Sequence, residues 1–333
     1  MTGNKVLVIT GPTATGKTAM AFSLARKFSG ELISADSRHV YKGMDIVTGK
    51  DLEGWEKDTS ASITVHSGNH TYTLSPYRKD SVLLWMYDVV APDEDFSVSS
   101  WDDCAHAAYR DCIQRKKLPV IVGGTGLYIS SFFHAAPSSS VPPDWEFRKA
   151  SEVMDVDELT SILSDLSAQT YRQMNDSDRH NPRRLIRRIE ILRAHGKMPQ
   201  ADLKGESYSS YDALWIGLTA QNTSLYGRID RRVDNRIHSG AAREIESLFA
   251  RYSQGLPSMS AIGYAQFTDG ESRNENSQRY LKAVQSWKFT EHGYARRQKT
   301  WLKKQSRIRW FDVDDLDFKE QVEAVVGRWY TKG

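Results

Sequence analysis

Cysteine is scarce in this chain of 333 residues, which carries only Cys104 and Cys112. Two cysteines cannot complete a zinc cluster. They stand eight residues apart on a segment expected to be helical, and this spacing separates them by about 12 Å at about 1.5 Å of rise per residue. That separation is too long for a disulfide, whose Cα atoms lie about 4.4–6.8 Å apart. The cysteine content therefore favours a reducing cytoplasm.

Long apolar runs and a strong net charge are also missing. No run approaches the roughly 20 apolar residues of a membrane span, and Met1 leads directly into the first predicted strand, so we expect neither a membrane anchor nor a signal peptide. The formal net charge of +3 is too small to indicate a nucleic-acid partner by itself. The 39% of hydrophobic and 26% of charged residues are ordinary for a globular protein of one large domain or two.

The most informative motif follows the first predicted strand, residues 5–9. Residues 11–18 read Gly-Pro-Thr-Ala-Thr-Gly-Lys-Thr, which matches the phosphate-loop pattern G-x-x-x-x-G-K-[ST], and a helix-like segment follows at 19–26. Glycines let backbone N–H groups converge on phosphate oxygens at a helix N-terminus. The motif therefore predicts a di- or triphosphate ligand, with Lys17 as a point charge and the Thr18 hydroxyl as a ligand of Mg²⁺. The residues expected to bind the phosphates are Gly11, Thr13, Ala14, Thr15, Gly16, Lys17 and Thr18.

Asp36 directly follows a second predicted strand, residues 31–35. This position places a carboxylate at the carboxyl edge of a parallel sheet, where open α/β folds bind ligands. Asp36 could cap a helix or stand behind a bound Mg²⁺, but we favour a general base that faces the reactive end of the ligand. A strand at 118–122 ends in Gly123-Gly-Thr-Gly126 at the same edge, which favours a binding role for Thr125 over a simple tight turn.

The remaining pattern predicts an α/β core interrupted by insertions. Alternating residues around a Ser-Gly-Asn turn predict an inserted β-hairpin at about 59–82. A Ser/Pro-rich hinge at 137–143 opens a polar, helical region without a convincing strand. We therefore expect a first part of the core at 1–136, a helical insertion domain at 137–210 and a second part of the core at 211–333. Further strands are expected at 84–90, 213–218 and 308–312, and helices at about 97–116, 223–252 and 276–303.

Arginine and lysine crowd two stretches, residues 172–197 and 291–309. Such a run often only solvates a helix face, and the sequence by itself favours that interpretation for Arg179, Arg183, Arg184, Arg187 and Arg188. The other interpretation is a surface that contacts nucleic-acid phosphates without reading sequence.

Taken in order, these motifs resemble those of the tRNA dimethylallyltransferases, also called tRNA isopentenyltransferases. Only the phosphate loop is common by itself, but the ordered set is specific and covers nearly the whole chain. The resemblance implies a P-loop NTPase-like parallel sheet flanked by helices, with an inserted, mainly helical tRNA-binding domain. The segments that carry it are residues 11–18, 35–46, 122–128, 181–190, 226–233, 261–264 and 294–301.

The resemblance also implies a reaction. The loop would hold the diphosphate of dimethylallyl diphosphate, and the five-carbon group would pass to the exocyclic amine (N6) of the adenosine 3′ of the anticodon, position 37, in tRNA. That base must be splayed out of its loop to reach a buried carboxylate. Asp36 would accept the proton of the amine, while Lys17, Arg228 and Mg²⁺ on Thr18 would stabilise the departing diphosphate. The catalytic residues implied are Asp36, Thr125 and Arg228, and the tRNA contacts are Asp36, Ser37, Arg38, His39, Thr125, Arg148, Arg183, Arg184, Arg187 and Arg297.

The chain departs from the family pattern in several places. His39 stands where the family usually has Gln, at a position expected to help hold the target adenine, and residues 84–88 replace a segment that contains His in many members. The hairpin at about 59–82 is extra material that could cap the channel, contact tRNA or be a neutral surface insertion, and we favour the last interpretation. The chain lacks the C-terminal zinc finger of eukaryotic relatives and so looks bacterial in type. We expect a monomer, because no unexplained apolar stripe stands out.

Three other functions stay open on the sequence. An adenylate dimethylallyltransferase would modify free AMP, ADP or ATP, but a free nucleotide needs no arginine-rich docking platform. A small-molecule kinase would hold ATP in residues 11–18, but it would leave residues 36–38, 123–126 and 296–301 unexplained. A non-catalytic RNA-binding protein that retains the fold draws slight support from His39.

Overall fold

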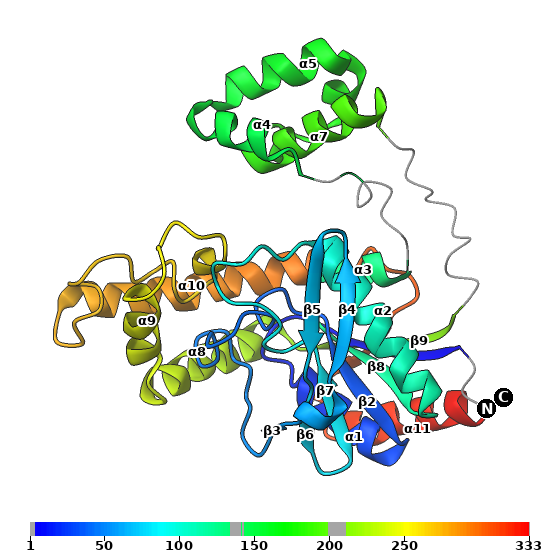
Figure 1. Cartoon of the computed structure of the whole chain (residues 1–333). Helices are drawn as coiled ribbons and strands as arrows, with labels where there is room; N and C mark the ends of the chain where they lie inside the picture. Colours follow the sequence, from blue (N-terminus) through cyan, green and yellow to red (C-terminus); the bar gives the residue numbers. More distant parts are fainter. Residues whose placement is uncertain (1–3, 134–140, 142, 199–210, 333) are drawn as a thin grey trace. The chain divides into compact units, whose positions relative to one another are not determined.

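The computed structural model describes residues 4–133, 141, 143–198 and 211–332. The described residues form two compact units (Figure 1). The core unit comprises residues up to 133 together with those from 211 onward, and the helical unit comprises residues 141 and 143–198. Each unit has a hydrophobic core of its own, so each can be described by itself.

An eight-stranded sheet forms the centre of the core unit, with the strand order β10-β9-β1-β8-β2-β7-β6-β3. The pairs from β10 to β7 are parallel, and only β6 and β3 at one end pair antiparallel. The inner strands are apolar along their whole length because helices cover both faces of a parallel sheet. The predicted α/β class is therefore confirmed. The strands are β1 (Lys5–Thr10), β2 (Gly30–Ser34), β3 (Glu56–Lys57), β6 (Tyr77–Lys79), β7 (Val82–Trp85), β8 (Leu118–Gly123), β9 (Asp212–Thr219) and β10 (Arg309–Asp312).

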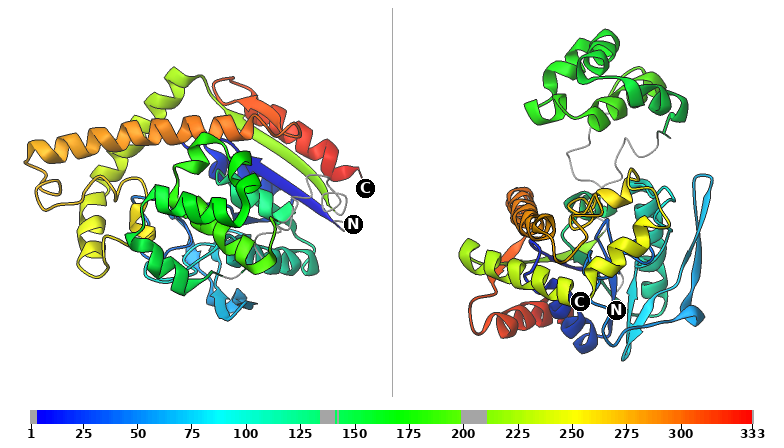
Figure 2. Two further views of the ribbon diagram at one scale, coloured as in Figure 1. Left: turned by 90° about the horizontal axis from the view of Figure 1, so that it is seen from above. Right: turned by 90° about the vertical axis from the view of Figure 1, so that its left-hand side faces the viewer.

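Helices pack on both faces of this sheet (Figure 2). Alternate residues of the strands enter two different cores. One core is shared with α2 and α3, and the other is shared with α1 and α11. The helices of the core unit are α1 (Lys17–Lys27), α2 (Val98–Gln114), α3 (Gly126–Phe133), α8 (Asn222–His238), α9 (Ala241–Phe249), α10 (Gln278–Leu302) and α11 (Phe318–Thr331), with 3₁₀ turns at Thr59–Ala61 and Ser258–Ser260.

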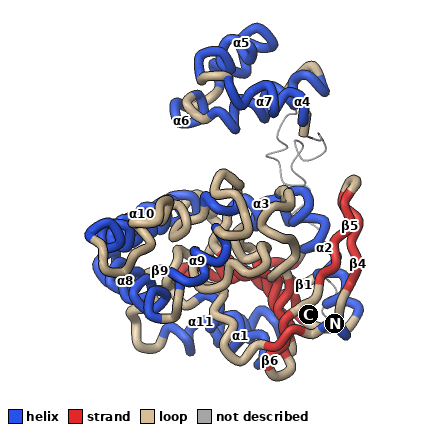
Figure 3. Tube along the Cα trace, turned by 60° about the vertical axis from the view of Figure 1, so that its left-hand side comes forward, coloured by secondary structure: helices blue, strands red, loops and turns tan. Residues whose placement is uncertain are grey.

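The predicted hairpin region holds two hairpins. β4 (Ile63–Ser67) and β5 (His70–Leu74) form a separate two-stranded sheet (Figure 3), and Val65 and Tyr72 bury one face of it in the core that includes α2. The second hairpin, β6–β7, joins the central sheet instead. The predicted hairpin turn at residues 67–69 is confirmed, because Ser67 pairs with His70 across it.

Two predicted elements end earlier than expected. The strand predicted at 84–90 stops at Trp85, since Met86 and Asp88 have φ angles of +73° and +53°, which a strand cannot contain. The helix predicted at 223–252 is broken between α8 and α9, where Gly240 has a φ of +100°. In both places a left-handed residue ends the regular element.

The helical unit contains helices and no strand among its described residues (Figure 3). Local signals fix its helix ends, since Asp155 and Glu158 form a capping box and Asn181 caps a helix whose first residue is Pro182. Its core includes Phe147, Leu159, Leu163, Leu185 and Ile189. The helices are α4 (Trp145–Ala150), α5 (Val156–Gln173), α6 (Asp176–Arg179) and α7 (Pro182–His195), with a 3₁₀ turn at Ser151–Val153.

Two expectations from composition can be compared with the structure directly. Cys104 and Cys112 are free and buried on α2, as their spacing predicted. None of the helices in the described parts of the chain has the length and apolar character needed to cross a membrane.

Glu31 on β2 is a buried carboxylate whose side chain is 1% exposed. It accepts hydrogen bonds from both terminal nitrogens of Arg115, one of them at 2.7 Å, and from the Trp85 indole at 3.0 Å. Burial by itself raises the pKa of Glu31, but the hydrogen bonds from Arg115 and Trp85 outweigh it, so the pKa lies below its ordinary value. Arg115 thus makes an ionised carboxylate tolerable beside the central sheet.

We predict that Arg115→Ala lowers the free energy of unfolding at pH 7 by about 3 kcal/mol. This value is the lower end of the range for removing one partner of a buried ion pair, because the Arg115 side chain is itself 37% exposed. The folded-state pKa of Glu31 is depressed, so its contribution is present above an ordinary carboxyl pKa of about 4.3 and is lost as the pH falls through the folded value. Urea unfolding from pH 3 to 8 measures both effects.

Arg110→Ala is the matched control, because Arg110 is exposed on the same helix. It should change the free energy of unfolding by less than about 0.5 kcal/mol. Equal losses in the two variants would show that Arg115 contributes only a surface charge.

Candidate active site

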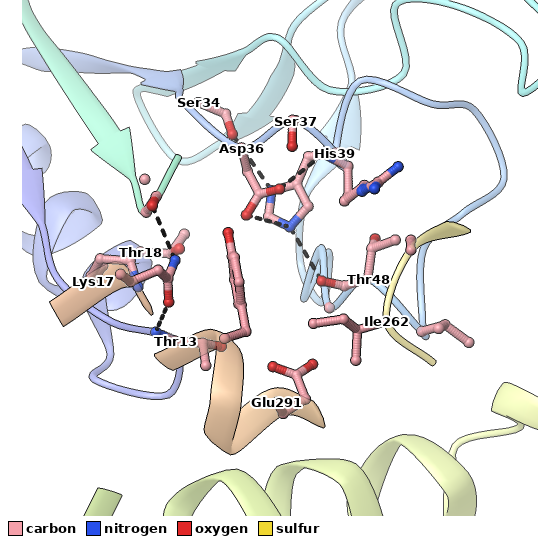
Figure 4. A pocket seen from close by; sticks show the side chains of 18 of the residues that line it. Thr13, Lys17, Thr18, Ser34, Asp36, Ser37, His39, Thr48, Ile262 and Glu291 are labelled. Carbon is pink, nitrogen blue, oxygen red and sulfur yellow. Dashed lines mark hydrogen bonds and ion pairs between the residues drawn. The ribbon is translucent and has the colours of Figure 1, made fainter. Parts of the chain in front are cut away.

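A pocket of about 340 Å³ lies at the carboxyl ends of β1, β2 and β8 (Figure 4). Its walls come from the phosphate loop, from residues 36–39 after β2, from Gly123 and Gly124 after β8, and from α8 and α10. The parallel register brings these strand ends together, since Thr10 pairs with Gly123 and Ser34 pairs with Val122. The pocket therefore lies at the same edge of the sheet at which the sequence places the candidate residues.

The phosphate loop is shaped by its glycines. Gly11 has a φ of +149°, and a Cβ there would lie 2.2 Å from the carbonyl oxygen of Leu218. Gly16 has a φ of +76° and precedes α1, whose N-terminus has no side-chain cap. The first N–H groups of α1 are therefore available to an anion. Within the loop, the Thr15 hydroxyl donates to the Pro12 carbonyl at 2.9 Å.

Lys17 lies in the wall of this pocket and donates to the Pro12 carbonyl at 2.7 Å. Burial and the nearby Arg232 lower the pKa of Lys17 to about 8, although Asp36 and Glu291 oppose this. A bound anion would relieve both causes. The ammonium group is therefore suited to a phosphate ligand, and without one it loses its proton at a lower pH than an ordinary lysine.

The Thr18 hydroxyl also faces the pocket, and it has no hydrogen-bond partner in the described parts of the chain. No group of three or more His, Cys, Asp or Glu side chains among those residues could hold a metal ion. Mg²⁺ is usually bound by one or two protein oxygens together with phosphates and water. The donor set therefore fits a magnesium ion that arrives with a phosphate ligand, and it does not fit a site made by protein alone.

Asp36 lies across the pocket from the phosphate loop. Its Oδ1 accepts the N–H of Arg38 at 2.9 Å, and its Oδ2 is 3.9 Å from Nε2 of His39. Burial raises the pKa of Asp36, but His39 when protonated, the Arg38 N–H and the Lys17 charge outweigh burial, so the pKa lies below its ordinary value. Asp36 is therefore ionised at neutral pH and able to accept a proton.

His39 is held on both ring nitrogens. Nε2 lies 3.3 Å from the Thr48 carbonyl, and Nδ1 lies 3.5 Å from the Ser34 hydroxyl. Tyr87 packs edge-on against the ring, with the centroids 4.7 Å apart. Burial lowers the pKa of His39 by more than Asp36 raises it. At neutral pH the uncharged ring then donates through Nε2 and accepts through Nδ1, so the Arg38 N–H and the Lys17 charge are the groups that favour the ionised form of Asp36 at that pH.

Thr125 lies beside the pocket and links the loop after β8 to the loop after β2. Its N–H donates to the Ala35 carbonyl at 3.2 Å, and its hydroxyl accepts the N–H of Ser37 at 3.3 Å. Ser37 and Arg38 line the pocket, and Arg38 also donates to the Pro257 carbonyl at 3.0 Å. The structure thus brings Thr125, Ser37 and Arg38 around Asp36, as their positions at one sheet edge suggested.

Sequence reasoning missed two further arginines on α8. Arg228, Arg232 and Arg236 are four residues apart, which places them on one helix face. Arg228 pairs with Asp314 at 2.9 Å and lines a second cavity of about 430 Å³ beside the phosphate loop. Arg232 lines both cavities and donates to the Thr13 hydroxyl at 3.2 Å. The spacing of four was the signal that could have found Arg232 and Arg236.

The structure also shows that α10 contributes to the pocket. Glu291 pairs with Arg236 at 3.1 Å, and both side chains are about nine-tenths buried. Gln298 accepts the N–H of Thr13 at 2.9 Å and donates to the Gly124 carbonyl at 3.1 Å. Arg297 lies next to Gln298 and lines the pocket, where the sequence had placed a tRNA contact.

The arginines expected to meet tRNA in the helical unit differ in their surroundings. Glu190, whose side chain is 1% exposed, pairs with Arg148 at 2.7 Å and with Arg187 at 2.8 Å. Arg184 pairs with Asp178. Arg183 is exposed and forms no ion pair with any residue that the structure describes. Arg148 and Arg187 therefore hold the helical unit together, whereas Arg183 faces solvent.

Known proteins resemble the chain over almost its whole length. The family model described as "IPP transferase" matches residues 70–305, and one described as "Isopentenyl transferase" matches residues 4–60. A tRNA dimethylallyltransferase of Anoxybacillus flavithermus is 33% identical over 329 residues, which are 97% of this chain and 96% of that protein. One of Roseiflexus castenholzii is 34% identical over 333 residues, covering 96% and 97% of the two chains.

Solved structures give the same result. The tRNA isopentenylpyrophosphate transferase of Bacillus halodurans is 29% identical, with a TM-score of 0.65 over 98% of this chain and 97% of that one. A eukaryotic dimethylallyltransferase acting on tRNA is 22% identical, with a TM-score of 0.74 over 97% of this chain and 78% of that one. The second likeness shows a common fold.

We predict that inorganic diphosphate binds less tightly above pH 8. The lowered pKa of Lys17, about 8, means that its cation is present below that pH and is lost as the pH rises. Only the cation attracts the anion, so affinity should fall about tenfold per pH unit beyond this point. Calorimetric titration with inorganic diphosphate from pH 6.5 to 9.5 measures the effect.

Lys17→Arg is the control, because a guanidinium stays charged over this range and its profile reports the ionisation of diphosphate alone. The proposed role of Lys17 would be wrong if both proteins showed the same profile.

Proposed function

Since this chain belongs to the IPP transferase family, we propose that it transfers a dimethylallyl group from dimethylallyl diphosphate to N6 of the adenosine at position 37 in tRNA. The relatives named tRNA dimethylallyltransferase favour this reaction over a free-nucleotide enzyme, a kinase and a non-catalytic RNA-binding protein. The observation that carries the proposal is that an ionised Asp36 and a phosphate loop face each other in one pocket. A base and a site for a leaving group are what this transfer needs.

The leaving group would lie against the N-terminus of α1. As the allylic C–O bond breaks, negative charge collects on the diphosphate. The uncapped N–H groups of α1, the Lys17 ammonium and the Arg232 guanidinium beside Thr13 would stabilise that charge. Arg228 would act from the neighbouring cavity beside the same loop. These donors are fixed before the reaction, which makes them effective.

Asp36 would act on the other reactant. The N6 nitrogen forms a bond to the allylic carbon and loses one proton, which Asp36 accepts. A neutral aromatic amine is a poor acid, but its N–H becomes strongly acidic once nitrogen has begun to bond to carbon. A carboxylate with a low pKa is then a sufficient base, and it is ionised whenever substrate arrives. Thr125 would help position it through the N–H of Ser37.

We propose Mg²⁺ as a companion of the diphosphate, held on the protein by the Thr18 hydroxyl. When bound, it would supply positive charge to the diphosphate oxygens. The free Thr18 hydroxyl facing the pocket supports this assignment.

We further propose that the protein acts as a monomer in the cytoplasm. The large apolar side chains that are exposed among the described residues are scattered singly over several elements, as on other monomeric proteins. The free Cys104 and Cys112 suit a reducing compartment, where tRNA substrates also occur.

We predict that Asp36→Asn lowers the rate of transfer by about 10²- to 10⁴-fold, the range for loss of a general base. Asn keeps the acceptor for the Arg38 N–H, so affinities for tRNA and dimethylallyl diphosphate should change little. The measurement is the incorporation of label from dimethylallyl diphosphate with Mg²⁺ into unmodified tRNA or into AMP, beside an ATP-hydrolysis assay. Asp93→Asn, at an exposed carboxylate outside the pocket, is the control.

Each other function has its own outcome in this experiment. Label in AMP instead of tRNA would indicate the free-nucleotide enzyme, and consumption of ATP would indicate a kinase. Near-normal transfer by Asp36→Asn would remove Asp36 from the role of base.

We predict that Arg183→Ala combined with Arg184→Ala weakens tRNA binding and flattens its salt dependence by up to about 0.7–0.9 log units per lost phosphate contact. Arg187 is left intact, because its loss would unpair the buried Glu190 and unsettle the helical unit. The measurement is a tRNA filter-binding titration at several salt concentrations.

Replacement of Lys319 and Arg328 by Ala, both exposed on α11, removes the same charge elsewhere. Equal salt slopes in the two double variants would mean that the arginines of α7 only solvate their helix.

A further inference from the structure

Apart from the two cavities beside the phosphate loop, an open groove of about 560 Å³ lies on the solvent-facing side of α10. All of its lining residues belong to α10. They include the small residues Ser286 and Gly293, and Phe289, which is 63% exposed. Arg297 lines both this groove and the pocket that contains Asp36. Figure 2 shows α10 along the outside of the core unit.

Some charged side chains of α10 have a polar partner and others have none among the described residues. Glu291 is the only acidic residue of the helix, and it is buried against Arg236. Most of its cations have partners in the described parts of the chain: Arg279 pairs with Asp269, Lys288 with Asp234, Lys299 with Asn222, and Arg296 with the Tyr226 hydroxyl.

Lys282 and Arg297 are the exceptions. Neither forms an ion pair with any described residue, and both line the groove. The Arg297 guanidinium lies 5.8 Å from the ring centroid of Tyr294, and it forms no hydrogen bond with a residue in the described part of the chain. Two unpaired cations therefore flank one exposed aromatic ring on the same helix face.

Phe289 contacts an aromatic side chain of its own helix. The ring of His292 meets it edge-on with centroids 6.1 Å apart. His292 is itself fixed, because it stacks on Tyr226 at 4.3 Å and its Nε2 lies 2.8 Å from Asp230. An aromatic ring that is open to solvent, beside a neighbour that is itself fixed, offers a face on which a flat partner can stack.

We propose that this groove binds the unpaired nucleotides that flank the target adenosine in the tRNA anticodon loop, with Phe289 stacking on a base and Lys282 and Arg297 contacting phosphates. This assignment rests on the proposed function. Exposed aromatic rings between cations are the usual means of holding single-stranded nucleic acid, since every base offers a face for stacking. Because Arg297 lines both hollows, the neighbours of a base inserted beside Asp36 would lie next to the groove.

The charge pattern favours RNA over a protein partner. Protein interfaces pair charges of opposite sign across the contact, whereas the charged residues of this groove are both cations and its other polar residues are neutral. In a symmetric dimer formed through this groove, the two cations of one copy would face the same two cations of the other copy and repel them.

The test uses the full chain and a fluorescent anticodon stem-loop that carries an unmodified adenosine. Phe289→Ala should raise the dissociation constant by about 5- to 150-fold, which is about 1–3 kcal/mol at 1.4 kcal/mol per factor of ten. The KM for tRNA should rise with it, while kcat at saturating tRNA and the KM for dimethylallyl diphosphate stay unchanged. Phe289→Trp should restore binding, and Lys282→Gln should reduce the salt slope by about 0.7.

Leu281→Ala is the matched control, because Leu281 is an apolar residue on the same helix, 57% exposed, that does not line the groove. Unchanged stem-loop affinity in Phe289→Ala would overturn the proposal. A shift from dimer to monomer in that variant, measured by light scattering, would also overturn it by showing self-association.

The assay separates this inference from the proposed function. If wild-type protein transferred no label to tRNA but Phe289→Ala still weakened stem-loop binding, the groove assignment would stand and the reaction would not. If wild-type protein transferred label to tRNA and both proteins bound the stem-loop equally, the reaction would stand and the groove assignment would not.

Discussion

The amide of Gln298 joins the two loops between which the pocket forms. Its oxygen accepts the N–H of Thr13 in the phosphate loop, and its nitrogen donates to the carbonyl of Gly124 after β8. The approach is so close that a Cβ at Gly124 would lie 2.1 Å from the amide nitrogen. Because Gln298 is buried on α10, the long helix sets the distance between the phosphate-loop motif and the sheet edge that carries Asp36. The same helix carries Phe289, so the pocket and the groove share one rigid element.

The charges in the pocket suit both halves of the proposed reaction. Lys17 and Arg232 lie near the phosphate loop, and the charge of Arg232 adds to burial in lowering the pKa of Lys17. Burial and Arg232 likewise lower the pKa of Arg236 to about 10, and Glu291 opposes that shift. A bound diphosphate would relieve this repulsion, and the relief would favour its binding. The charge of Lys17 also favours the ionised form of Asp36, so in the proposed reaction one cation would stabilise the leaving group and help to keep the base ionised.

The fold could be predicted where local patterns are strong. The buried strand at 118–122, the phosphate loop and the helical character of residues 144–198 follow from apolar runs, glycine placement and helix caps, and the structure has them. The end of β7 could not be predicted, because the positive φ of Met86 is imposed by packing and not by a residue type that prefers it. Helix α11 was missed, although Val322 and Val326 show the spacing of four that marks a buried helix face.

The site divides in the same way. Asp36 and Thr125 could be placed together because parallel strands end at one edge, which is a rule of topology. Arg232 could not be chosen over Arg228, since both lie on one face of α8 and only packing decides which faces the phosphate loop. Nor does sequence distinguish a cation held by a carboxylate from a free one. Arg187 and Arg183 stand four residues apart in one basic run, yet the first is bound to the buried Glu190 and the second is exposed. The pairing of each charge, more than the number of charges, therefore decides which basic residues remain available to a nucleic acid.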